Sequence, residues 1–151
     1  FMELDEISAI IEEHNKTPHL RMAQKKLAWD LTCRVHGEDA AKRVRDASAV
    51  LFGETDIREA SAELLDTLSA EIPFAKAGSE IGGPITDLLV LSGGCASKGE
   101  AKRKIKEGGV YLNGSKVTEE TRQLSSEDLL DGGYVQLRVG KKDFRLVKFG
   151  D

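Results

Sequence analysis

The sequence lacks the residues on which several classes of protein depend. It has two cysteines, Cys33 and Cys95, which lie far apart and outside any CxxC or Cys/His ligand spacing. Neither a disulfide framework nor a zinc site is therefore predicted. No run approaches the roughly 18 apolar residues that span a membrane, and nothing resembles a signal peptide. We expect a cytoplasmic protein that does not enter membranes.

Motifs for catalysis and cofactor binding are also missing. The three histidines have no metal-ligand spacing and are expected to be solvated or to cap helices; they are His14, His19 and His36. The stretch Gly93–Lys98 superficially resembles a phosphate loop, but its glycines are wrongly spaced and Gly99 stands where Ser or Thr is needed. No GxGxxG and no nucleophile elbow occur. We expect no catalytic residue, no metal and no cofactor in this chain.

Charge is distributed unevenly along the 151 residues. Residues 1–82 carry 10 Lys/Arg against 16 Asp/Glu, whereas residues 83–151 carry 12 against 10. This asymmetry suggests that the second half meets a polyanion while the first half does other work. Because the sequence starts at Phe1 rather than Met, we expect a fragment of a longer protein.

Periodicity divides the chain into a helical half and a mixed half. Apolar residues at helical spacing predict helices over residues 4–14, from Thr17 as N-cap to Gly37, and from Asp39 to Phe52, followed by shorter helical turns. The stretch PFAKAGSEIGGP is too broken by proline and glycine for a helix or a regular strand, and predicts a linker. We therefore expect a helical bundle over residues 1–72, a linker over 73–83 and a second domain over 84–151.

The second domain is predicted to be α+β. An apolar helix is expected over residues 85–91, and two alternating strands at residues 134–139 and 144–149 form a hairpin with lysines at its tip. With a further hairpin at residues 110–117, this gives two or three helices on four short strands.

Local signals are densest between Ser97 and Val117. Ser97 with Glu100 forms a capping box, which predicts a helix beginning at Lys98. Gly108 and Gly109 end that helix, and the Asn-Gly pair at residues 113–114 predicts a type I′ hairpin.

The same stretch concentrates positive charge. It holds six Lys/Arg against two Glu, and the basic residues are Lys98, Lys102, Arg103, Lys104, Lys106 and Lys116. A solvated helix face is one interpretation of this pattern. The other is a surface that contacts a phosphate backbone, which the neighbouring polar hairpin favours.

These residues resemble a known RNA-binding family. The block from Leu88 through SKGEAKR to GGVYLNG is similar to the S-four-like RNA-binding domain, and PHLRMAQKKLA followed by VHGE resembles the helical anticodon-side domain of bacterial tyrosyl-tRNA synthetase. The resemblance covers nearly the whole chain. It implies the C-terminal third of such an enzyme, because the HIGH and KMSKS signatures of the catalytic domain do not occur here.

The resemblance also implies partners and contact residues. In the family this region grips the anticodon stem and long variable arm of tyrosine tRNA, while the parent enzyme uses ATP and dimerises through its catalytic domain. The residues expected to contact RNA, by matching position or as part of the basic helix, are Ser97, Lys98, Lys102, Arg103, Lys106, Asn113 and Lys116. Tyr111 could stack on a base, but packing within the sheet is the more common role of such a residue.

Two other functions stay open at this point. A stand-alone S-four-like protein of ribosome-associated or RNA-modifying type would prefer ribosomal RNA to tyrosine tRNA. A protein-interaction module would use Trp29 and Met22, which lie off the main apolar stripe of the helical half.

Overall fold

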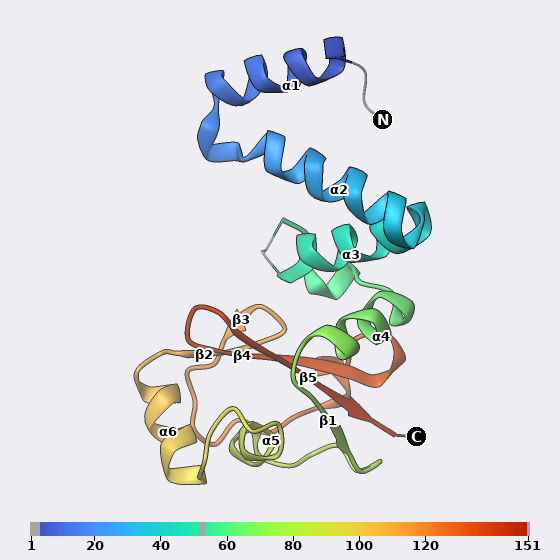
Figure 1. The fold of residues 1–151 in the computed structure, drawn as a ribbon. Coiled ribbons are helices and arrows are strands. Elements are labelled where there is room, and N and C mark those ends of the chain that lie inside the picture. The colour runs from blue at the N-terminus through green and yellow to red at the C-terminus, as the bar shows by residue number, and fades with distance from the viewer. Residues whose placement is uncertain (1–3, 52–53, 151) are drawn as a thin grey trace. The chain divides into compact units, whose positions relative to one another are not determined.

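The computed structural model describes residues 4–51 and 54–150. They form two compact units, residues 1–45 and residues 46–151 (Figure 1). Within the described ranges, no helix is both long and apolar enough to cross a membrane.

The first unit is helical. It contains α1 (Leu4–Lys16), the 3-10 helix η1 (Pro18–Leu20), α2 (Met22–His36) and the start of α3 (Glu38–Leu51). The prediction of one helix from Pro18 to His36 is wrong, because Arg21 adopts a left-handed φ of 52° and separates η1 from α2. Thr17 is the N-cap residue with Pro18 after it, as predicted, but the helix that it precedes is the short η1. Its hydroxyl donates to the Glu13 carbonyl and accepts no hydrogen bond from a backbone N–H of η1.

The second unit is built on a five-stranded sheet in the order β1-β5-β4-β2-β3. The strands are β1 (Phe74–Ala77), β2 (Val110–Leu112), β3 (Ser115–Lys116), β4 (Tyr134–Val139) and β5 (Asp143–Phe149). Only β1 and β5 pair in parallel; the other described neighbours are antiparallel. The α+β class is therefore confirmed.

Strand β1 lies where no regular structure was predicted. Its four residues lie between Pro73 and Gly78, and four residues are enough for a short edge strand. Proline is tolerated immediately before such a strand. The Leu146 N–H donates to the Pro73 carbonyl at 3.0 Å and extends the ladder with β5. Residues 78–83 contain no helix or strand. The division into domains at residues 73–83 stays a prediction, which limited proteolysis would test.

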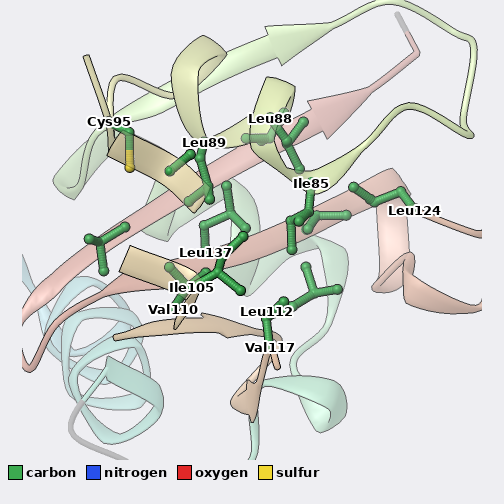
Figure 2. Close-up of a cluster of buried hydrophobic side chains, with 14 residues drawn as sticks. Ile85, Leu88, Leu89, Cys95, Ile105, Val110, Leu112, Val117, Leu124 and Leu137 are labelled. Carbon is green, nitrogen blue, oxygen red and sulfur yellow. The ribbon is translucent and has the colours of Figure 1, made fainter. Parts of the chain in front are cut away.

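Two helices cover one face of the sheet. They are α5 (Ile85–Leu91) and α6 (Lys98–Lys106), whose apolar side chains meet alternate strand residues in one core (Figure 2). Ile105 of α6, for example, shares this core with Val110 of β2 and Leu137 of β4. Both buried residues of α6, Ala101 and Ile105, lie on the narrow stripe that the sequence predicts, which leaves the rest of the helix in contact with solvent.

A second core lies on the sheet residues that alternate with those of the first. It joins the end of α3, the 3-10 helix η2 (Ile57–Glu59) and α4 (Ala62–Glu71) to Leu130, Tyr134 and Leu146. Residues from Asp46 onward therefore pack in the same unit as the sheet. Two further 3-10 helices, η3 (Ser126–Asp128) and η4 (Asp131–Gly133), connect the β2–β3 hairpin to β4.

Candidate nucleic-acid interface

Helix α6 begins at the predicted cap. The Ser97 hydroxyl accepts a hydrogen bond from the Glu100 N–H at 3.2 Å. The Glu100 carboxylate reaches back to the N–H of Ala96 at 2.8 Å, one residue before the one that a standard capping box uses. This hydrogen bond, followed by the one from Lys104, lowers the pKa of Glu100. The Ser97 side chain is exposed, and its hydroxyl oxygen already accepts a hydrogen bond from its own helix.

The end of α6 fixes the start of β2. Gly108 has a φ of 70°, and its N–H donates to the Ile105 carbonyl, while that of Gly109 donates to the Lys104 carbonyl, both at 2.9 Å. This is the Schellman pattern, which the two glycines predict. A side chain at Gly108 would also collide with the end of the Lys116 side chain. The Lys116 ammonium therefore lies at the C-terminal end of α6.

The β2–β3 hairpin has the predicted type I′ turn, with φ of 46° at Asn113 and 80° at Gly114. Asn113 is buried: its amide oxygen accepts from the Gln136 N–H at 2.9 Å, and its amide nitrogen donates to the Asp128 carbonyl at 2.6 Å. The side chain predicted to contact RNA is therefore used to tie the turn to β4 and η3.

Three basic residues of α6 share one stripe. Lys98, Lys102 and Lys106 are spaced four apart, which places them one above another along the helix, and all three are exposed. Arg103 lies next to Lys102 and is also exposed. With Lys116 at the C-terminal end of the helix, these residues form the surface that we call the α6 stripe (Lys98, Lys102, Arg103, Lys106 and Lys116).

Several of these charges have carboxylate neighbours. Lys98 lies 2.7 Å from Asp87 and Lys106 lies 3.1 Å from Glu120, in pairs whose lysines remain 65% and 70% exposed. Arg103 lies 3.9 Å from Glu107 on the same helix. Such solvent-exposed pairs stabilise a protein by about 0–1 kcal/mol, so a phosphate can replace the carboxylate at little cost.

Two members of the stripe have no such neighbour. Lys102 and Lys116 form no ion pair with any residue in the described part of the chain. They are the charges most available to an external anion.

One further basic residue, Arg138 on β4, was not predicted from the sequence. It lies directly opposite Tyr111 on one neighbouring strand, β2, and Phe144 on the other, β5. The Arg138 guanidinium carbon lies 3.8 Å from the centre of the Tyr111 ring and 5.8 Å from that of Phe144. The only signal in the sequence was the alternation of YVQLRV, which puts Arg138 on the face opposite Leu137.

His, Cys, Asp and Glu side chains are the possible metal ligands of the described residues. No group of three or more His, Cys, Asp or Glu side chains there could hold a metal ion. Burial raises the pKa of the Cys95 thiol, which disfavours the reactive thiolate.

Comparison with known proteins gives the family. Residues 63–147 match the family described as "Tyrosine--tRNA ligase SYY-like C-terminal domain". The chain belongs to this family. The SYY-like match begins within α4 and ends within β5, so it covers both helices α5 and α6 and all of the sheet except the last two residues of β5.

Individual relatives extend the similarity beyond the SYY-like region. The tyrosine–tRNA ligase of Anaeromyxobacter dehalogenans is 43% identical over 150 residues, which are 98% of this chain and 36% of the relative. That of Corynebacterium diphtheriae is 38% identical over 149 residues, with 99% and 36% covered. The chain thus spans about a third of the length of these relatives.

A solved structure resembles about two thirds of this chain. The solution structure of a tyrosyl-tRNA synthetase C-terminal domain superposes with a TM-score of 0.51 at 27% identity, and covers 64% of this chain and 96% of its own. The sequence resemblance to the C-terminal region of this enzyme family is therefore confirmed.

Proposed function

We propose that this chain is the tRNA-binding portion of a tyrosine–tRNA ligase. It grips the anticodon stem and long variable arm of tyrosine tRNA, so that the acceptor end reaches a catalytic domain outside this sequence. The observation that carries the proposal is the α6 stripe, a group of exposed cations on helix α6 and the adjoining strand β3, in a chain whose relatives are named tyrosine–tRNA ligases.

The stripe suits a folded RNA for a physical reason. Each lysine or arginine that neutralises a phosphate releases condensed counterions, which favours binding without any base-specific contact. Irregular junctions such as the base of a variable arm are recognised by shape and by their phosphates. The contact set that we propose is Ser97, Lys98, Lys102, Arg103, Lys106 and Lys116; Asn113 is left out because its amide already bonds to Gln136 and Asp128.

The parent enzyme completes the proposal. It would use ATP to activate tyrosine in its catalytic domain, form a homodimer through that domain and work in the cytoplasm. In this proposal the role of the present chain is to position the tRNA.

A double substitution tests the role of the stripe. Lys102→Ala with Arg103→Ala should weaken binding of the 151-residue chain to tyrosine tRNA by about 10-fold or more, because two charge-assisted hydrogen bonds to phosphate are removed. Lys76→Ala removes a charge from the exposed surface of β1, at the other edge of the sheet, and should leave binding unchanged. Equal affinities for the double variant and the wild type would refute the proposed surface.

Two further measurements test the finer claims. Ribonuclease footprinting should show protection of the anticodon stem and variable arm. Competition should show that tyrosine tRNA displaces a ribosomal RNA fragment of equal length. Preference for the ribosomal fragment would instead support the stand-alone RNA-binding module.

A further inference from the structure

The sheet carries a second basic feature on the face opposite α5 and α6. Arg138 lies between two aromatic residues, Tyr111 and Phe144, which its register pairs with it on the neighbouring strands. In β4, every second residue points into the core shared with α5 and α6, namely Val135, Leu137 and Val139. Arg138 lies between two of them in the sequence and therefore points away from this core. All three members of the row are partly exposed.

A groove of about 880 Å³ lies beside this row. Its walls come from the end of α3 and η2, from the β2–β3 turn and from the tip of the β4–β5 hairpin. Four cations line it, namely Arg58, Arg138, Lys141 and Lys142. The groove therefore reaches the β2–β3 turn. Strand β3, which follows this turn, carries Lys116 of the α6 stripe.

The carboxylates of the groove are already engaged. Asp143 lies 3.1 Å from the Arg145 guanidinium, and Asp56 accepts a hydrogen bond from the Arg58 backbone N–H at 3.0 Å. Lys141 and Lys142 are exposed and form no ion pair within residues 4–51 and 54–150. An excess of positive charge is thus left in the groove.

Arg138 is held in place but is not satisfied. Its guanidinium is stacked on Tyr111 at 3.8 Å, yet its buried Nε donates no hydrogen bond to any described residue. Arg58 is fixed in a similar way, because its Nη2 donates to the Ser115 hydroxyl at 2.6 Å. Stacked, oriented guanidinium groups present a planar fork of donors, which matches the oxygens of a phosphate.

We propose that this groove binds a phosphate of the RNA backbone where the strand passes the β2–β3 turn. The inference rests on the proposed function and adds a second contact region, on the sheet face opposite helices α5 and α6. Arg138 and Arg58 bind the phosphate oxygens, and Lys141 and Lys142 at the rim attract the adjoining phosphates. The RNA thus contacts the domain on both sides of the hairpin.

Two variants test the groove. Lys141→Ala with Lys142→Ala removes exposed charges, and Arg138→Lys keeps the charge and removes the fork. In filter binding of the 151-residue chain to transcribed tyrosine tRNA, each variant should bind about 3- to 10-fold more weakly. The lysine double variant should also lower the slope of log K against log salt by about 0.7–0.9 for each phosphate that is no longer neutralised. Lys76→Ala is the control and should match the wild type.

The outcomes separate this inference from the function on which it rests. If Lys102→Ala with Arg103→Ala weakens binding and both groove variants match the wild type, the groove is refuted and the proposed function stands. If all these variants match the wild type, both ideas fail. If the groove variants alone weaken binding, the groove stands and the α6 stripe is refuted.

A second readout distinguishes an RNA phosphate from a free one. The ¹⁵N–¹H signal of Arg138 Nε, assigned by its loss in Arg138→Lys, should shift when tyrosine tRNA is added. At equal ionic strength, inorganic phosphate at the same molar ratio should leave it unmoved. Saturation by inorganic phosphate alone would overturn the assignment to the RNA backbone in favour of a free-anion site, and no shift with either would overturn the site itself.

Discussion

The Arg138 guanidinium lies over the Tyr111 ring, with its central carbon 3.8 Å from the ring centre. The two residues are directly opposite on β4 and β2, so the contact follows from strand register. One face of the Tyr111 ring is therefore covered by Arg138. Of the two roles expected for Tyr111, packing within the sheet and stacking on a base, the structure has the first. The Tyr111 ring also orients the Arg138 side chain.

The Tyr111–Arg138 contact gives a first prediction. Tyr111→Leu should destabilise the fold by about 0.5–1 kcal/mol through loss of the cation–π interaction, in addition to the change in buried area. Tyr111→Phe keeps the ring and should retain most of that stability. Urea denaturation followed by circular dichroism measures both variants. A Phe variant as unstable as the Leu variant would show that ring stacking contributes nothing.

Asn113 gives a second prediction, which distinguishes a structural role of its side chain from a role in RNA contact. Asn113→Ala should destabilise the protein by about 2–4 kcal/mol, because the Gln136 N–H and the Asp128 carbonyl lose their partners and alanine disfavours the left-handed φ. Asn113→Asp keeps the acceptor for Gln136 and should be less harmful. Thermal unfolding should rank the variants in this order. A stable Asn113→Ala protein that binds tRNA weakly would instead make Asn113 an RNA contact.

Tyr134 predicts a loss of stability at alkaline pH. Burial, followed by the hydrogen bond that its hydroxyl donates to Asp66, raises the pKa of Tyr134 to about 12 from 10.0. The folded state holds this proton more tightly than the unfolded chain does. The contribution of the Tyr134 hydroxyl to the free energy of unfolding is therefore complete below pH 10 and is lost as the pH rises through about 12.

Tyr134→Phe isolates that contribution. At pH 7 the variant should be less stable by about 1 kcal/mol, the usual net contribution of such a hydrogen bond. The difference from the wild type should shrink between pH 10 and pH 12 in urea titrations. A difference that stays constant over this range would contradict the raised pKa.

Glu100 predicts the opposite dependence, at acid pH. Its pKa is lowered from 4.5, chiefly by the hydrogen bond from the Ala96 N–H. The contribution of the Glu100 carboxylate to the free energy of unfolding is therefore present above pH 4.5. It is lost as the pH falls through the lower pKa that this group has in the folded state. Glu100→Gln should be less stable than the wild type at pH 6, and the two should converge towards pH 3. The midpoint of urea unfolding at each pH provides the measurement, and parallel pH profiles would exclude this role for the carboxylate.

Local chemistry made part of this fold predictable. The cap at Ser97, the glycine stop after Lys106 and the Asn-Gly turn each depend on a few adjacent residues, and the structure has all three where they were predicted. The stripe on α6 follows in the same way, since helical spacing alone puts Lys98, Lys102 and Lys106 on one face.

Features set by distant contacts were not predictable in this way. Strand β1 exists because β5, some 70 residues later, offers it a parallel partner. Arg138 stacks on Tyr111 only because β4 pairs with β2 in one register. Asn113 is buried because η3 and β4 close over the turn, which the turn signal itself does not reveal. Each case needed the pairing of strands far apart in the sequence.

The salt dependence of tRNA binding tests the central claim most directly. Affinity of the 151-residue chain for tyrosine tRNA should be measured between 50 mM and 300 mM salt, for the wild type, for Lys102→Ala with Arg103→Ala, and for Lys76→Ala. We predict that log K for the wild type falls with log salt at a slope of about −4 or steeper, and that the double variant loses about 1.5 of that slope. A wild-type affinity that does not change with salt, or a double variant with the wild-type slope, would contradict binding of RNA phosphates by the α6 stripe.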